Sequence, residues 1–177
     1  MKYDKKTRNI FIQPADKVAP FLLGKLICRR LQNGGIHKFR ICEVEAYNGN
    51  DTANYGYQYI GKKPSKATIP LFKEGGISCL YAGMFLIVCG DVSEPDNVLI
   101  RACAEKEQIC SGPLKVADAL KVKEIDWEQG VDLLNSDIVW LESDEGIIGT
   151  TCKTQRIGLG KNVSEEDRKK ACRFIMI

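Results

Sequence analysis

Two carboxylates and an aromatic ring alternate along the octet Cys42–Gly49, which reads Cys-Glu-Val-Glu-Ala-Tyr-Asn-Gly. Side chains of an extended strand alternate between its two faces, so Glu43, Glu45 and Tyr47 are expected to project from the same face. A carboxylate beside an aromatic ring suits chemistry on a flat ligand, because the ring can stack on it while the acid accepts a proton or activates water. The alternative is a solvated strand face, and the octet alone does not decide between the two.

The elements that position this octet are predicted as hairpins. Segments 25–31 and 36–47 are separated by Asn33-Gly34-Gly35, residues that tolerate the positive φ of a tight turn. A second hairpin is predicted over 77–89 and a further strand over 98–103, because short apolar runs there are bounded by turn residues. These strands predict a sheet that is largely antiparallel.

The remaining chain is predicted to hold an irregular loop over 48–74 and several short elements. The latter are a helix capped by Asp16, a helix opened by Ser111-Gly112-Pro113, a strand over 137–141, a strand at Arg156-Ile157-Gly158, a helix capped by Ser164 and a final strand over 173–177. Hairpins interspersed with helices indicate an α+β fold with a curved, mainly antiparallel sheet packed by short helices.

Composition restricts the class of protein. The chain has 177 residues, of which 44% are hydrophobic, and no shift in composition marks a boundary, so we expect one domain over 1–177. With 28% charged residues and no apolar run approaching about 18 residues, neither disorder nor a membrane span is expected. No signal-peptide pattern is seen, which favours a cytoplasmic location. A net charge of +3 does not by itself predict nucleic-acid binding.

The eight cysteines are scattered through strand-like runs without a Cys-x-x-Cys pair. Since His37 is the single histidine, the ligand spacing of a zinc site is missing, and we expect no metal. A disulfide framework is not expected in a domain of this size.

Seven short motifs occur in one order along the chain. They are Phe21-Leu22-Leu23-Gly24, Glu43-Val44-Glu45-Ala46-Tyr47, Leu71-Phe72, Gly83-Met84, Val98-Leu99-Ile100-Arg101-Ala102, Cys110-Ser111-Gly112-Pro113 and Arg156-Ile157-Gly158. In this order and spacing they resemble the alkyladenine (3-methyladenine) DNA glycosylase family. The resemblance extends from about residue 14 to the end of the chain, and its specificity comes from the combination, because each motif alone is weak.

The resemblance implies an enzyme that flips a damaged purine nucleotide out of duplex DNA and hydrolyses its N-glycosidic bond, because the sugar is inaccessible inside the base stack. By position, Glu45 matches the carboxylate that deprotonates the attacking water, and Arg101 matches an arginine that helps to hold the water and the nucleotide. Tyr47 matches the ring that stacks on the base. The resemblance implies no cofactor, and a monofunctional hydrolase that leaves an abasic site.

Departures from the family pattern gather where the base is expected to bind. A family histidine aligns with Tyr55, one ring of a Tyr-x-Tyr pair is replaced by Cys79, and a purine-screening asparagine aligns with Cys89. The tyrosine that wedges into the space left by the flipped base becomes Ala82, and Tyr81 could replace it if the hairpin shifts by one residue.

The remaining DNA contacts implied by the resemblance are Gly83, Met84, Ser111 and Lys115. The expected partner is double-stranded DNA with a damaged base, and the protein is expected to be a monomer. The expected location is the bacterial cytoplasm, at the nucleoid, or the nucleus in a eukaryote. Three interpretations stay open: an active glycosylase with altered base selectivity, a catalytically weak protein that binds damaged nucleic acid, and a relative that acts on a free nucleobase or nucleoside.

Overall fold

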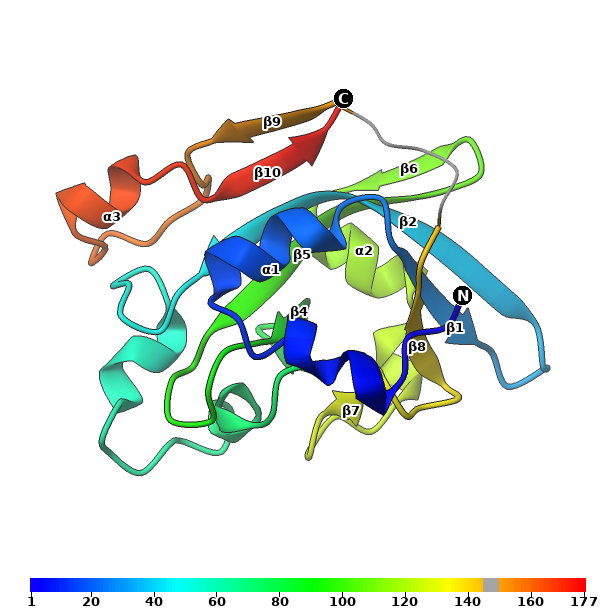
Figure 1. Ribbon diagram of the computed structural model, residues 1–177, viewed down its shortest axis with the longest axis horizontal. Coiled ribbons are helices and arrows are strands. Elements are labelled where there is room, and N and C mark those ends of the chain that lie inside the picture. Colours follow the sequence, from blue (N-terminus) through cyan, green and yellow to red (C-terminus); the bar gives the residue numbers. More distant parts are fainter. Residues whose placement is uncertain (145–149) are drawn as a thin grey trace.

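Strand β2 (Ile36–Tyr47) is the central element of the computed structural model, which describes residues 1–144 and 150–177. It follows β1 (Leu26–Arg30) through a turn in which Gly34 has a φ of 84°, a left-handed conformation that glycine adopts without steric cost. In Figure 1, β2 runs across the molecule with β5 (Asn97–Glu105) beside it. The hairpin predicted over 25–31 and 36–47 and the strand predicted over 98–103 are therefore confirmed.

The other described strands are short. They are β3 (Ile77–Tyr81), β4 (Met84–Val88), β6 (Gln108–Ser111), β7 (Val131–Asp132), β8 (Val139–Glu142), β9 (Thr151–Thr154) and β10 (Arg173–Met176). The sheet order is β7-β3-β4-β5-β2-β1-β8, with β6 on β5 and β10 joining β2 to β9. Every described strand pair is antiparallel, which confirms the predicted α+β fold with a mainly antiparallel sheet.

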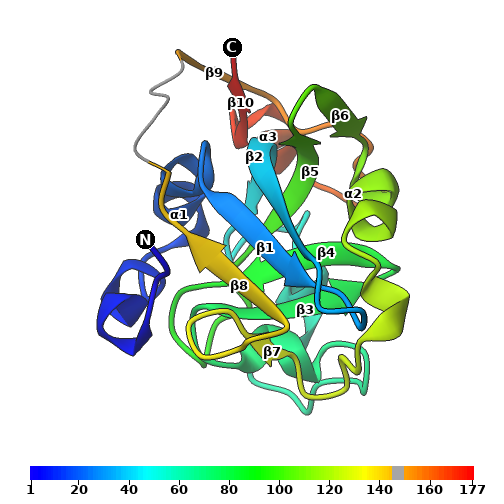
Figure 2. The ribbon, with the colours of Figure 1, turned by 90° about the vertical axis from the view of Figure 1, so that its right-hand side faces the viewer.

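Short helices complete the fold. They are α1 (Ala15–Leu22), α2 (Pro113–Ala119) and α3 (Glu165–Lys169), with 3₁₀ turns η1 (Lys5–Ile10), η2 (Tyr55–Tyr59), η3 (Ile69–Phe72) and η4 (Val122–Glu124). Helix α1 packs on β2, and α2 packs on β4 and β5. Figure 2, at right angles to Figure 1, shows β8, β1, β2 and β5 following one another around the curved sheet. None of the described helices is long and apolar enough to cross a membrane.

The two faces of the central strands carry different contents. Val44 and Ile100 belong to the main core together with the buried residues of α1 and α2. The opposite face carries a smaller apolar cluster that includes Leu86 and Leu99. Because alternate residues of a strand share a face, this second face also receives the odd-numbered side chains at the end of β2, among them Glu45. The sheet thus separates the main core from the side on which Glu45 and Tyr47 lie.

The pairing of β2 with β5 contains two irregularities. Cys42 on β2 and then Arg101 on β5 each lie without a direct partner, between residue pairs that remain in register. These flanking pairs are Ile41 with Cys103, Glu43 with Ala102, and Val44 with Ile100. An extra residue in one strand changes the direction of its side chain, and such bulges are common beside active sites. Here the bulge turns Arg101 toward the carboxylates of β2.

Two local predictions are wrong. Asp16 does not cap α1: the helix begins after Pro14, and the backbone N–H of Asp16 donates to Asn48 Oδ1 over 3.1 Å. The cap therefore comes from a loop distant in sequence. The strand predicted at residues 156–158 is also wrong, because β9 ends at Thr154 and the chain then bends toward the end of β2.

Two other local predictions hold, one of them in part. Ser164 Oγ accepts from the backbone N–H of Asp167 over 3.1 Å, as the capping motif of α3 predicts. Pro113 opens α2 as predicted, but Ser111 is the last residue of β6 and provides no capping hydrogen bond.

Candidate active site

Glu45 is fully buried and holds three hydrogen bonds with residues that the structure describes. Its Oε2 accepts from the Tyr47 hydroxyl over 2.8 Å and from Arg101 Nη1 over 3.1 Å, and its Oε1 accepts from the backbone N–H of Ile157 over 2.8 Å. These donors come from β2, β5 and the segment after β9, so three parts of the chain meet at one carboxylate. A buried carboxylate needs such partners, because its desolvation would otherwise be costly.

Arg101 is oriented by a second carboxylate. Its Nε donates to Glu43 Oε1 over 3.0 Å, and the same oxygen accepts from Arg173 Nε of β10 over 2.7 Å. The hydrogen bond to Glu43 raises the pKa of Arg173 above its ordinary value. Glu43, for which sequence analysis gave no specific role, thus joins β10 to β5 and fixes the guanidinium that reaches Glu45.

Tyr47 links the carboxylate to a cavity. Its hydroxyl contacts Glu45 while its ring forms part of the cavity wall, and the guanidinium of Arg156 lies 4.9 Å from the ring centroid. Burial, followed by the neighbouring charge of Glu45, raises the pKa of Tyr47 well above its ordinary value. The phenol therefore remains a hydrogen-bond donor throughout the ordinary pH range.

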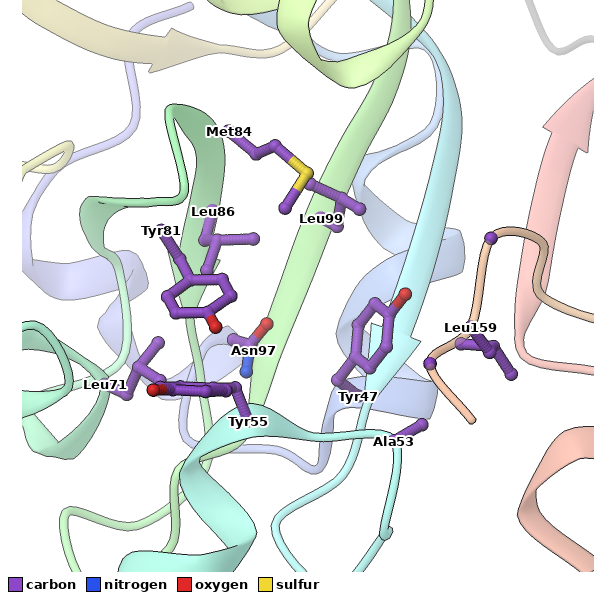
Figure 3. A pocket seen from close by; sticks show the side chains of 12 residues that line it. Tyr47, Ala53, Tyr55, Leu71, Tyr81, Met84, Leu86, Asn97, Leu99 and Leu159 are labelled. Atoms are coloured by element: carbon purple, nitrogen blue, oxygen red, sulfur yellow. The ribbon is translucent and has the colours of Figure 1, made fainter. Parts of the chain in front are cut away.

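The cavity has a volume of about 190 Å³ and a mainly aromatic and aliphatic wall. Its described lining consists of Tyr47, Ala53, Tyr55, Leu71, Tyr81, Met84, Leu86, Asn97, Leu99, Gly158, Leu159 and Gly160. Figure 3 shows Tyr47 on one side and the Tyr55 and Tyr81 rings on the other, with Asn97 between them. An apolar cavity of about 150 Å³ holds a benzene ring, so this space fits a small flat ligand.

Tyr55 and Tyr81 form one side of the cavity together. Their ring centroids are 4.2 Å apart, and burial followed by the neighbouring phenol of Tyr55 raises the pKa of Tyr81 to about 12. Tyr81 pairs with Met84 across a two-residue turn, so the hairpin tip consists of Ala82 and Gly83, with φ values of 48° and 78°. The Tyr81 ring therefore lies in the cavity wall, whereas the exposed tip carries only a methyl group.

Loop 48–56 carries Tyr55 to this position. The Asn54 side chain donates to the carbonyl oxygens of Tyr47, Asn48 and Pro95, and its own oxygen accepts from the backbone N–H of Gly56. A Cβ at Gly56 would collide with Pro95, which explains the glycine directly after Tyr55. Asn54 thus ties the start of η2 to the end of β2.

A second hollow lies beside the first. Ala82, Met84, Ser111 and Lys115 line it with neighbouring residues of α2, and Met84 belongs to both cavity walls. The structure thus brings together residues of three elements for which sequence analysis predicts DNA contacts. Within residues 1–144 and 150–177, no group of three or more potential metal ligands gathers.

Comparison with known proteins identifies the family. The family model described as methylpurine-DNA glycosylase matches residues 9–176, nearly the whole chain. The chain belongs to the methylpurine-DNA glycosylase family. The predicted relationship is therefore confirmed.

Relatives within the methylpurine-DNA glycosylase family come from several bacteria, and each carries the provisional name 3-methyladenine DNA glycosylase. A protein of Borrelia garinii subsp. bavariensis is 31% identical over 94% of this chain and 93% of its own length. One of Chlorobium phaeovibrioides is 31% identical over 92% and 90%. One of Clostridium botulinum is 39% identical over a shorter match, 54% of this chain and 48% of its own.

Two cysteines predicted to contact the base lie elsewhere in this family member. Cys79 is 1% exposed inside the smaller apolar cluster, and Cys89 is fully buried in the main core. Val88 lies on the cavity side of the sheet, so the next residue points to the opposite face. Neither cysteine lines the described cavity wall.

Sequence reasoning missed three parts of the site. The backbone N–H of Ile157, the cavity-lining segment 158–160 and Asn97 contribute to it, although sequence analysis gave none of them a role in the site. Asn97 carries a weak signal, because it is a polar residue at the start of an otherwise apolar strand. The motif Arg156-Ile157-Gly158 marked part of segment 157–160 but not its role, because that role depends on where the C-terminal chain crosses β2.

Proposed function

We propose that the protein is a monofunctional DNA glycosylase that takes a damaged purine out of duplex DNA into the cavity and hydrolyses its N-glycosidic bond. The observation that carries the proposal is the joining of a carboxylate to an aromatic cavity: Tyr47 contacts Glu45 and also forms the cavity wall. The names of the bacterial relatives support the same activity.

Base binding rests on the three tyrosine rings. A flat purine inserted between Tyr47 and the pair formed by Tyr55 and Tyr81 would stack on aromatic faces, which contributes about 1–3 kcal/mol per base in nucleic-acid complexes. Enzymes that act on a base in duplex DNA extrude it to reach the reacting atoms. Lys115 and Ser111, beside the hairpin tip, are proposed to contact the DNA backbone.

The proposed chemical step is hydrolysis at the sugar C1′. A water oxygen forms a bond to C1′ while the bond from C1′ to the base nitrogen breaks and its electron pair leaves with the base. Glu45 takes the proton of the water, and its charge stabilises the positive charge that develops on the sugar. Arg101, held by Glu43, orients Glu45. From its match to the family motif, Arg101 is also proposed to keep the water and the nucleotide in place.

Glu45 retains room for one more hydrogen bond. A carboxylate offers about four acceptor positions, and three are taken by Tyr47, Arg101 and Ile157. Within the described residues, the free acceptor position is on Oε1, which accepts only from the backbone N–H of Ile157. Gly158, the next residue along the chain, lines the cavity. A catalytic water is therefore proposed to approach Glu45 from the side of segment 157–160.

A second candidate function has one observation in its favour. Glu45 is fully buried and is not among the described lining residues of the cavity. This position favours a protein that binds a damaged base but cleaves it inefficiently. In that case the cluster around Glu45 would serve to hold β2, β5 and segment 157–160 together.

A single-turnover assay separates the two functions. Excess protein is incubated with duplexes that each contain one alkylated base, hypoxanthine or 1,N6-ethenoadenine, and base release is measured after cleavage of abasic sites. Release from at least one duplex, absent from an undamaged control of the same sequence, supports the glycosylase. Tight binding of a damaged duplex without release from any of them would overturn it in favour of the binding protein.

A further inference from the structure

Asn97 is the first residue of β5 and lies at the centre of the cavity wall. Its strand position is opposite Tyr47 on β2 and Val88 on β4. The side chain lines the cavity although the residue is only 4% exposed, and Figure 3 shows its amide between the Tyr47 and Tyr81 rings. Among the described lining residues, it alone carries an amide.

The orientation of this amide follows from its hydrogen bond. Asn97 Nδ2 donates to the carbonyl oxygen of Pro95 over 2.9 Å, and Asn54 donates to the same oxygen over 2.8 Å. Because a carbonyl can only accept, the NH₂ group of Asn97 must face Pro95, and Oδ1 must face away from it.

The oxygen of the same amide has no protein partner among the described residues, because no described group donates to Asn97 Oδ1. Since this oxygen is not among the buried side-chain atoms without a partner, it is open to the cavity, where it can accept a hydrogen bond from a ligand.

We propose that Asn97 determines base specificity: Oδ1 accepts a hydrogen bond from an N–H group on the inserted base, and the cavity therefore selects purines that present such a donor. This inference rests on the proposed glycosylase function and names the substrate class of the same site. The neighbouring walls do not make this distinction. Leu71, Leu86 and Leu99 are apolar, and a tyrosine hydroxyl can rotate to donate or to accept.

Damaged purines differ in this donor. Hypoxanthine carries N1–H and 3-methyladenine carries an exocyclic amino group, whereas 1,N6-ethenoadenine has no N–H on its ring system. A site that uses a buried polar group to bind a substrate donor discriminates against an analogue without it, because the polar group then loses its partner. Ethenoadenine is expected to gain only stacking in this cavity.

The test compares two duplexes that differ only in the damaged base, hypoxanthine or 1,N6-ethenoadenine. Asn97→Leu keeps the approximate volume of the side chain and removes the acceptor. The single-turnover rate for hypoxanthine is expected to fall by about tenfold, the effect of one hydrogen bond, while the rate for ethenoadenine changes by less than about twofold. Leu99→Ala is the matched control: it alters the same wall without changing a polar group, so both rates should move together.

The outcomes distinguish this inference from the proposed function. Equal changes of both rates in Asn97→Leu would overturn the role of Asn97 while leaving the glycosylase activity established. If the unaltered protein releases neither base, the proposed function fails, and the affinities of the two duplexes decide the inference: a loss confined to hypoxanthine supports it, and equal affinities overturn it. Asn97→Ala, which also lacks the acceptor, replaces Asn97→Leu if melting shows that the latter is unfolded.

Discussion

The hydroxyl of Tyr47 donates to Glu45 Oε2 over 2.8 Å, and the same ring forms part of the cavity wall. A ligand that stacks on this ring and the carboxylate of Glu45 would therefore contact the same rigid side chain, which fixes their positions relative to each other. The Arg156 guanidinium also lies over this ring, in a cation–π contact. In the proposed reaction, this contact is what connects the fully buried Glu45 to a base held in the cavity.

Glu45→Gln is expected to remove base release while leaving DNA affinity nearly intact. Gln has the shape of Glu but cannot accept the proton of the water, so the single-turnover rate should fall by about 10²–10⁴-fold. Affinity is measured with a duplex that carries an abasic-site mimic. Glu43→Gln is the matched control two residues away, and because Glu43 acts through Arg101 its rate loss should be smaller. Equal losses of rate and affinity in Glu45→Gln would mean that Glu45 is structural.

Tyr81→Ala is expected to weaken binding of damaged duplex and of damaged single strand by similar factors. The ring lies in the cavity wall against Tyr55, so its loss removes stacking on the base, about 1–3 kcal/mol, in either substrate. Fluorescence anisotropy with both substrates measures this. A wedge residue would behave differently, because it helps to open the duplex and is dispensable in a single strand. A loss seen only with duplex would therefore assign Tyr81 to the wedge.

Asn54→Ala is expected to lower the free energy of unfolding by about 2–4 kcal/mol, because it removes the four hydrogen bonds of the Asn54 side chain that hold loop 48–56. Since the same side chain positions the loop that carries Tyr55, affinity for damaged DNA should fall in parallel. Urea unfolding and a binding titration measure the two effects. Asn9→Ala, an exposed asparagine in η1, should change stability by less than about 0.5 kcal/mol. Unaltered stability of Asn54→Ala would show that the loop is held by other contacts.

Asp96 is expected to make stability depend on pH. Burial raises its pKa to about 6, against about 3.9 in an unfolded chain, although the backbone N–H of Gly49 donates to it. Between about pH 4 and 6 the folded protein thus binds more protons than the unfolded chain, so the Asp96 contribution to stability falls as the pH rises through this window.

The Asp96→Asn variant is expected to lack this decline. The stability of the variant minus that of the unaltered protein should therefore increase from pH 4 to 7. Melting temperatures across this range measure it. Asp118→Asn, at an exposed carboxylate of α2, is the control and should follow the unaltered protein. A difference for Asp96→Asn that is the same at every pH would contradict the assignment. Using the difference removes contributions of groups such as Asp167, where hydrogen bonds outweigh burial and lower the pKa.

The sequence by itself determined the local framework and the family. The Asn-Gly-Gly turn and the alternating pattern that follows it depend only on neighbouring residues, and they placed Glu43, Glu45 and Tyr47 on one face of β2. The order of the short motifs along the chain was sufficient for the family, because order and spacing survive when single residues change.

Tertiary structure decided how the site is closed. Arg101 reaches Glu45 because a bulge leaves it unpaired between two in-register segments, Ile157 contributes a backbone N–H because the C-terminal chain crosses β2, and Asn97 faces the cavity because β5 pairs with both neighbours there. Each of these positions depends on the register between strands far apart in sequence. A shift of one residue would turn the same side chains to the other face of the sheet, and no local pattern of residues records that choice.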